Sequence, residues 1–294
     1  MGMTRGGAQN AHPAWASPAG ERTGRFTGAG GMDLFRRWWR PPAPARAVVA
    51  NIHGLGDHSG LYPRLVDHLV GAGFAVHAPD LRGNGRSPGR RAYVARWDEF
   101  REDLRRFLAV VRAEEPGLPL FLLGNSLGGL IVLDYALHHP EDLRGVVAAS
   151  PPLGRLGVPA PLLFAGRILS RVWPTFALQT GMDLAGLARD PAVVAAVLAD
   201  PLFHRYGTAR LSTEVVAAIG RVQAGAAAFP LPLLLLHGGA DRMVPPDGTR
   251  RFAAAVRHPD VRLIEYPDGY HVLFADVDRE RVLGDLERWI AARV

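Results

Sequence analysis

The 294-residue sequence contains no cysteine and no lysine, and both absences limit what the protein can be. Without cysteine there are no disulfides, no cysteine-ligated zinc or iron–sulfur clusters and no cysteine nucleophile. Arginine therefore supplies every basic side chain behind the formal charge of +6. The arginines are interspersed with acidic residues, and no block of five or more like charges occurs, so we expect no nucleic-acid partner.

Long apolar runs are also missing. No stretch of about 18 uncharged apolar residues occurs, so no membrane span is predicted. Residues 1–24 are rich in Gly, Ala and Pro but lack the apolar stretch of a secretory signal, which predicts a mobile tail and, by default, a cytoplasmic location. Apolar residues make up 48% of the chain and charged residues 21%, as expected for a globular protein with a sizeable core.

Short apolar stretches alternate with helical patterns along most of the chain. The stretches "RAVVANI", "FAVHAPD", "LPLFLLG", "GVVAAS" and "PLPLLLLHG" predict buried strands, and segments such as "WDEFREDLRRFLAVVRAE" have apolar residues at helical spacing. This alternation is typical of an α/β fold with a mostly parallel central sheet and helices on both faces. Before it, residues 24–41 predict two antiparallel strands joined by a Gly-rich turn.

Residues 152–229 interrupt the alternation. They contain short helical pieces separated by Gly and Pro and no convincing strand. We therefore predict an all-helical cap over the carboxyl edge of the sheet, where ligands bind in open α/β sheets; an insertion without a role in binding is the alternative. The predicted organisation is a tail (1–24), a core (25–151 and 230–294) and this cap (152–229).

The stretch "LLGNSLGGL" places Ser126 between a predicted strand and a predicted helix. Gly124 and Gly128 complete the pattern G-x-S-x-G, in which a sharp turn exposes the serine Oγ above the sheet and small flanking residues allow strand and helix to approach. The serine also lies at a helix N-terminus, where the free N–H of Leu127 can stabilise an oxyanion. Ser126 is thus a candidate nucleophile, and a simple helix N-cap is the alternative.

A nucleophilic serine requires a base and a carboxylate that orients the base. In this fold class the acid and then the histidine follow the serine along the chain. His271 comes just after the last predicted strand and is a better candidate than His237 or His258. Asp241 follows the strand "LLLLHG" and is the predicted acid, because Asp268 lies too close to His271 in sequence; a turn-forming role for Asp241 is the alternative.

The loop "NIHGLGDHSGLYP" follows an early strand and predicts the second oxyanion donor. Gly54 and Gly56 allow its backbone to bend toward the serine, and the N–H of Leu55 is the predicted donor. His53 is interpreted as structural, holding the loop through a side-chain hydrogen bond. The backbone N–H is the working group, so the Leu55 side chain can vary.

Other patterns give no cofactor or metal site. The glycines of residues 82–89 do not have dinucleotide-loop spacing, and no Gly-rich turn opens a helix with Lys-Ser or Lys-Thr. His138 and His139 are adjacent and therefore poorly placed to share a metal. We expect neither a metal nor a cofactor.

Six motifs together resemble the monoacylglycerol lipase and lysophospholipase branch of the α/β-hydrolases. They are "HGLGDHSGLY", "DLRGNGRSPGRRAYV", "GNSLGG", "DPLFHRYG", "GGADRMVPP" and "GYHVLF". The resemblance extends from about residue 25 to the C-terminus and implies a triad of Ser126, Asp241 and His271, with oxyanion donors at Leu55 and Leu127. The family usually has G-H-S-M-G-G, whereas this chain has Asn125 and Leu127, a difference that bears on substrate preference.

The resemblance implies a serine ester hydrolase that cleaves monoacylglycerols through an acyl-enzyme on Ser126. A lysophospholipase or a short-chain carboxylesterase would use the same triad, and an inactive fold that binds lipid is an alternative of another class. Gly54, Asn125, Leu162 and Leu163 are predicted to contact the substrate, the last two within an apolar stripe of the cap. That stripe could instead touch a micelle or membrane surface, or pack within the cap. The sequence gives no oligomeric state.

Overall fold

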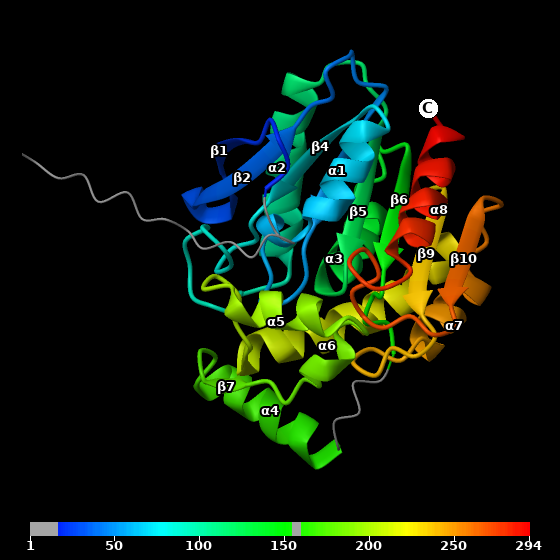
Figure 1. The fold of residues 1–294 in the computed structure, drawn as a ribbon. Helices are drawn as coiled ribbons and strands as arrows, with labels where there is room; N and C mark the ends of the chain where they lie inside the picture. Colours follow the sequence, from blue (N-terminus) through cyan, green and yellow to red (C-terminus); the bar gives the residue numbers. More distant parts are fainter. Residues whose placement is uncertain (1–16, 155–159) are drawn as a thin grey trace, which may run out of the picture.

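Eight strands form one sheet that runs through the molecule (Figure 1). The computed structural model describes residues 17–154 and 160–294, and the side chains of residues 160–163 lie outside the described part. The strand order is β1-β2-β4-β3-β5-β6-β9-β10. β2 pairs antiparallel with both β1 and β4, and the other neighbouring strands are parallel. The predicted mostly parallel sheet with an antiparallel pair at its start is confirmed.

The strands coincide closely with the apolar stretches of the sequence. They are β1 (Arg22–Thr27), β2 (Asp33–Trp39), β3 (Ala47–Ile52), β4 (Phe74–Pro79), β5 (Leu120–Asn125), β6 (Gly145–Ala149), β9 (Leu233–Gly238) and β10 (Val261–Tyr266). β1 begins three residues before the predicted start of the core at residue 25. All residues of β3, β4, β5, β6 and β9 are buried, as expected for strands covered on both faces.

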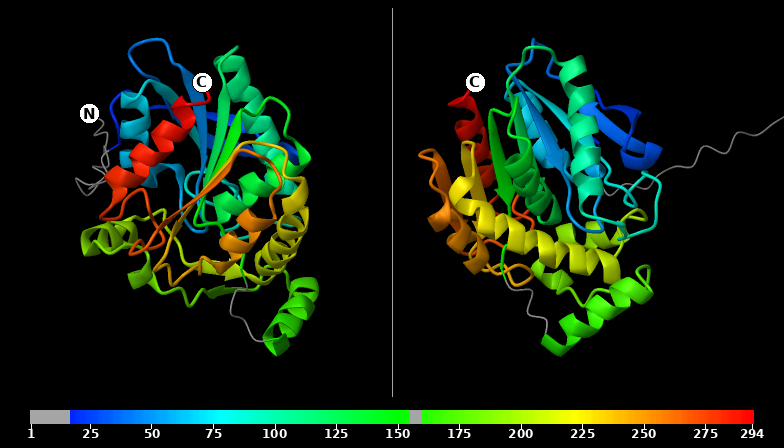
Figure 2. Two further views of the ribbon diagram at one scale, coloured as in Figure 1. Left: turned by 90° about the vertical axis from the view of Figure 1, so that its right-hand side faces the viewer. Right: turned by 180° about the vertical axis from the view of Figure 1, so that it is seen from behind.

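Helices cover both faces of the sheet (Figure 2). The buried side chains on each face form an apolar core. Helices α1 (Pro63–Gly71) and α8 (Arg279–Ala291) lie on one face. Helices α2 (Asp98–Glu114), α3 (Leu127–His138) and α6 (Ala209–Gly225) contribute to the other. Successive strand residues point to opposite faces, so Val48 joins the core of α2 and α3 while Val49 joins that of α1 and α8.

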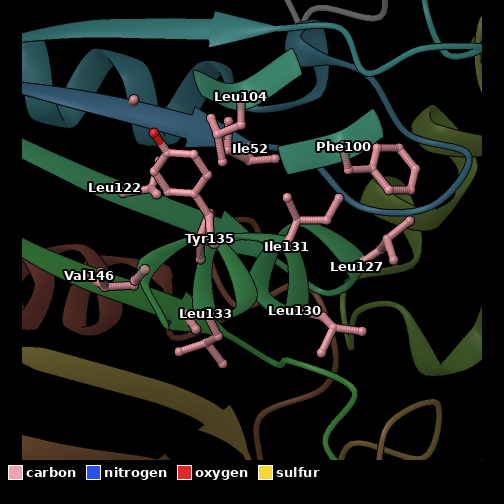
Figure 3. Packing of buried hydrophobic residues seen from close by; sticks show 14 of the residues in the cluster. Ile52, Phe100, Leu104, Leu122, Leu127, Leu130, Ile131, Leu133, Tyr135 and Val146 are labelled. Atoms are coloured by element: carbon pink, nitrogen blue, oxygen red, sulfur yellow. The ribbon is translucent and has the colours of Figure 1, made fainter. Parts of the chain in front are cut away.

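Helix α3 is the most deeply buried helix next to the sheet. Every residue from Leu127 to Ala136 is buried, which explains why its sequence is apolar almost throughout. Figure 3 shows α3 side chains, including Ile131, packed with Ile52 and Leu122 of the strands and with Phe100 of α2. This packing fixes the start of α3, the end that bears the candidate nucleophile.

The segment 152–229 is called the cap segment below, and its described residues, 152–154 and 160–229, lie beyond the carboxyl ends of the parallel strands (Figure 1). Its described helical elements are α4 (Ala160–Val172), η4 (Leu184–Gly186), α5 (Pro191–Ala199), α6 and η5 (Ala226–Ala228). The prediction that it is all-helical is wrong, because β7 (Ala177–Gln179) and β8 (Tyr206–Thr208) pair antiparallel. Three-residue strands are too short to show an alternating pattern, and their partners are far apart in sequence.

None of the helices in the described ranges combines the length and the apolar character that crossing a bilayer requires. Helix α7 (Asp247–Ala255) lies between β9 and β10 along the chain. The 3-10 helices η2 (Ala29–Gly31) and η3 (Ser59–Leu61) complete the described secondary structure.

Candidate active site

Ser126 occupies a strained turn between β5 and α3. Its backbone angles are φ 52° and ψ −120°, in a region that residues other than glycine rarely adopt. The Ser126 N–H donates to the Ala149 carbonyl (2.8 Å), which holds the turn against the end of β6. The turn therefore keeps the side chain at the carboxyl edge of the sheet.

The glycines around Ser126 are required by close backbone contacts. A Cβ on Gly124 would overlap the carbonyl oxygen of Gly128, and a Cβ on Gly128 would overlap that of Ile52. These contacts bring strand β5, helix α3 and the end of β3 together at one point. The G-x-S-x-G spacing is thus explained by packing.

Asp241 and His271 meet above the sheet from two different loops. Asp241 follows β9, and His271 lies on the loop after β10. His271 Nδ1 is 2.7 Å from Asp241 Oδ2, and both side chains are almost fully buried. The other oxygen, Oδ1, accepts hydrogen bonds from Met243 N and Val244 N at 2.9 Å each. The carboxylate is therefore fixed in the orientation that directs it at the imidazole.

The charge state of Asp241 suits a group that stabilises an imidazolium. Burial alone would raise the pKa of this carboxyl, but hydrogen bonds from His237, His271 and Val244 N–H outweigh it and hold the pKa well below its usual range. Asp241 therefore remains ionised at neutral pH. In a serine hydrolase, a fixed negative charge at this position holds the imidazole in the orientation that catalysis requires.

Ser126 and His271 line the same pocket. The described residues include no hydrogen bond between Ser126 Oγ and His271 Nε2. Such bonds are often long without substrate and tighten in the complex. The structure thus brings all three predicted triad residues to one place, with the Asp–His bond formed.

Two backbone N–H groups lie near Ser126. Leu127 is the first residue of α3, and a Cβ built on Gly54 would lie 3.3 Å from Ser126 Cβ, so the loop containing Leu55 closely approaches the serine. Within the described residues, neither Leu55 N–H nor Leu127 N–H donates to another protein group. Both donors are available to a substrate oxygen.

His53 holds this loop in place, as the sequence suggested. Its Nδ1 is 2.8 Å from Gly54 O, and its Nε2 accepts a hydrogen bond from Leu81 N (2.9 Å). Burial lowers the pKa of His53, so the ring remains neutral and can accept that bond. The interaction fixes the bend just before Leu55.

The pocket at Ser126 has a largely apolar wall and a polar corner. Its volume is about 70 Å³, small beside typical ligand pockets of roughly 300–1,000 Å³, so a long acyl chain requires side chains of the wall to move. The apolar lining consists of Leu55, Leu61, Met182, Leu184, Leu187, Val197, Phe203, Met243 and Val272. At the polar corner, Tyr62 OH donates to Asp57 Oδ2 (2.6 Å).

Gly54 and Asn125, two of the predicted substrate contacts, line this pocket, and their contact with substrate stays a prediction. Asn125 is buried, and its Oδ1 has no hydrogen-bond partner in the described protein. Leu162 and Leu163 belong to α4, but their side chains lie outside the described residues, so their predicted contact with substrate stays a prediction.

Sequence reasoning missed most of the pocket wall. Asp57 and Tyr62 lie within the motif "HGLGDHSGLY", and Phe203 lies within "DPLFHRYG", so their proximity to recognised motifs was a usable signal. Met182 and Leu187 gave no comparable signal, because only the folding of the cap segment brings them to the pocket at Ser126. No group of three or more His, Asp or Glu side chains suited to a metal ion occurs in residues 17–154 and 160–294.

The sheet order, the helical coverage and the serine at the β5–α3 turn define the α/β-hydrolase class. Residues 43–278 match the family described as serine aminopeptidase, S33. The chain is 33% identical to the monoacylglycerol lipase of Mycolicibacterium smegmatis, over 92% of this chain and 96% of that one. It is 31% identical to the human monoglyceride lipase, over 90% and 89% of the two chains.

Solved structures show the same relationship. The monoacylglycerol lipase of Paleococcus ferrophilus matches with a TM-score of 0.81 and 34% identity, covering 90% of this chain and all of that one. A soluble variant of the Saccharomyces cerevisiae monoglyceride lipase, bound to a substrate analog, matches with a TM-score of 0.83 and 26% identity over 92% and 94% of the chains. The chain belongs to the serine aminopeptidase S33 family and, within the α/β-hydrolases, to the monoacylglycerol lipase branch.

Proposed function

We propose that this protein is a serine ester hydrolase that cleaves monoacylglycerols to a fatty acid and glycerol. The observation that supports it most directly is the 2.7 Å contact between His271 and Asp241 in the pocket that contains Ser126. The relatives named monoacylglycerol lipase, which match nearly the whole chain, support the substrate. The His271–Asp241 contact and the named relatives both support activity as a carboxylic ester hydrolase.

In the proposed mechanism, His271 takes the proton of Ser126 Oγ as the oxygen attacks the ester carbonyl. Asp241 stabilises the imidazolium that forms. The N–H groups of Leu55 and Leu127 hold the negative oxygen of the tetrahedral intermediate, and losing one such donor costs roughly 3 kcal/mol. His271 then protonates the leaving glycerol, and water activated by the same ring releases the fatty acid.

The pocket fits a substrate with one apolar chain and a polar head. Apolar residues of the cap segment, such as Leu187 and Val197, would contact the acyl chain. Asp57, Tyr62 and Asn125 provide donors and acceptors for hydroxyl groups. Lysophospholipase activity, general short-chain esterase activity and an inactive lipid-binding fold are not favoured, because Ser126 shares its pocket with the bonded pair of His271 and Asp241, and the two relatives described above are named monoacylglycerol lipase and monoglyceride lipase.

We also propose that the chain divides into a tail, a core and a cap. We further propose that the protein is a cytoplasmic enzyme, peripheral to the membrane, whose cap segment contacts a lipid surface. Phe164, Ile168 and Val172 are four residues apart on α4 and are 64%, 51% and 79% exposed. Trp173 next to them is 57% exposed. Four-residue spacing places such side chains on one helix face, an arrangement suited to lying on a bilayer interface.

Replacing Ser126 by Ala tests the proposed function. The variant should lose about 10,000-fold or more of kcat with monoolein and with p-nitrophenyl butyrate, since the nucleophile is absent. A fluorophosphonate should label the parent protein and not the variant. Residual turnover within tenfold of the parent, in a folded variant, would overturn the proposal.

A further inference from the structure

We propose that Asp276 is a positioning residue that, together with Arg189, fixes the His271 loop to the pocket wall formed by the cap segment. The inference rests on the proposed function and adds a group that does not touch the substrate. Asp276 lies five residues after His271, just before α8, and is 1% exposed. Arg189 lies in the cap segment between η4 and α5.

The Asp276 carboxylate connects the two regions directly. Its Oδ2 accepts a hydrogen bond from the N–H of Tyr270 (3.2 Å), the residue that precedes His271. Its Oδ1 accepts from Arg189 N (2.8 Å), and Arg189 Nε donates to Oδ2 (3.0 Å). One carboxylate therefore holds the backbone next to the imidazole and both the backbone and the side chain of a cap residue.

Two backbone hydrogen bonds run beside this contact. His271 N donates to Gly186 O (3.3 Å), and Val272 N donates to Leu187 O (2.8 Å). His271, Val272 and Leu187 all line the pocket. The orientation of the imidazole and the position of the acyl-binding wall are thus set by the same set of contacts.

The charge of Asp276 gives the contact its strength. Burial raises the pKa of its carboxyl, but backbone N–H groups and the Arg189 guanidinium outweigh burial and lower the pKa below its usual value. A buried carboxylate is stable only while its partners are in place. In Asp276→Asn one acceptor oxygen becomes a donor, so at least one of these partners loses its acceptor and the loop is free to shift.

Asp103 provides a matched control. It is 3% exposed, accepts from Ala29 N (2.7 Å) and binds the Arg82 guanidinium at 2.6 and 2.8 Å. The chemistry resembles that of Asp276, but Asp103 does not line the pocket at Ser126. Asp103→Asn therefore measures the effect of weakening a buried carboxylate–arginine contact on stability alone.

The experiment compares Asp276→Asn, Arg189→Met, Arg189→Lys and Asp103→Asn with the parent. It measures Tm, kcat and KM with p-nitrophenyl butyrate and monoolein, and the rate of labelling by a small fluorophosphonate. Asp276→Asn should lower kcat by about tenfold or more with both esters, because a 1 Å misplacement can cost about 100-fold. The labelling rate should fall in parallel, since labelling needs the same Ser126–His271 pair.

Arg189→Met should lower kcat less than Asp276→Asn, and Arg189→Lys should recover part of that loss. Asp103→Asn should lower Tm and leave kcat, measured well below Tm, within twofold of the parent. Equal kcat and labelling rates in Asp276→Asn and Asp103→Asn would overturn the inference while leaving the proposed function intact. If Asp276→Asn does not fold, an Arg189→Met variant with the parent's kcat would also overturn the inference. A parent protein that hydrolyses neither ester would overturn both proposals.

Discussion

The sheet core and the cap segment differ in how firmly their residues are enclosed. Every residue of strand β5 is buried, whereas all three residues of β7 are exposed. Helix α3 is buried on all sides, whereas α4 packs mainly against α6 and presents apolar side chains to solvent. Yet the pocket takes its serine and imidazole from the core and much of its wall from the cap segment.

This difference in burial corresponds to two requirements of the reaction, bond cleavage and substrate entry. Bond cleavage requires groups held to within fractions of an ångström, and close-packed surroundings supply that rigidity. Substrate entry requires a wall that can move, because the pocket as it stands is too small for a long acyl chain. Changes to the core residues that hold Ser126, Asp241 and His271 should therefore affect kcat with every ester, and changes to the exposed face of α4 should affect only lipid-borne substrates.

Asp241→Asn should give the largest effect. The amide cannot offset the imidazolium charge and presents a donor to His271 Nδ1, so kcat should fall about 10,000-fold. Its remaining carbonyl oxygen can still accept from Met243 N and Val244 N, so the fold should persist. The measurement is steady-state hydrolysis of p-nitrophenyl butyrate.

The control for this variant is Asp247→Asn, which alters an exposed carboxylate that pairs with Arg250 on α7. Its kcat should equal that of the parent. A loss below tenfold in folded Asp241→Asn would show that this carboxylate does not act on His271.

The triple change Phe164→Ser, Ile168→Ser and Val172→Ser should have a smaller and selective effect. Burying one such side chain fully is worth roughly 1.5–3 kcal/mol, and about 1.4 kcal/mol is tenfold in affinity. Sedimentation with phosphatidylcholine vesicles containing monoolein should therefore show binding at least about tenfold weaker, since three such side chains are lost. Hydrolysis of soluble p-nitrophenyl butyrate should be unchanged.

A control pair of exposed apolar residues in the core, Val277→Ser with Val294→Ser, should leave vesicle binding intact. Equal vesicle binding by the α4 triple variant and the parent would exclude this helix face as the contact with lipid.

His204 lies at the boundary between the core and the cap segment. His204→Gln should have the smallest effect, a change in how Tm depends on pH. His204 N donates to Gly56 O, and its ring Nε2 is 2.9 Å from Asn84 Oδ1. Burial lowers the pKa of His204 from 6.5 to about 4, and nearby Arg91 acts in the same direction.

The sign of the pH effect follows from these values. Between pH 6.5 and about 4 the unfolded chain binds a proton at His204 that the folded protein does not, so stability decreases as the pH falls through this window. The glutamine amide can keep the bond to Asn84 without titrating. Tm should therefore decrease less on acidification in His204→Gln than in the parent. Identical Tm profiles for His204→Gln and the parent would contradict this assignment.

Local patterns predicted the core well because each of its elements has a repeating apolar pattern of its own. The strand before Ser126 and the helix after it are both present, with the turn that G-x-S-x-G predicts. The β7–β8 pair was missed because its two strands are three residues long and about 30 residues apart, too short to leave a pattern. The Asp276–Arg189 contact was missed for a related reason, since its residues are 87 apart and each resembles an ordinary surface charge.

The sequence by itself determined the alternation of strands and helices, the turn at Ser126 and the residue types available for catalysis, because these depend on neighbours along the chain. Only the tertiary structure decided that Asp241 and His271 meet at 2.7 Å and that Leu187 and Phe203 line the pocket at Ser126. Those positions depend on which distant segments pack together, and packing is set by the whole core.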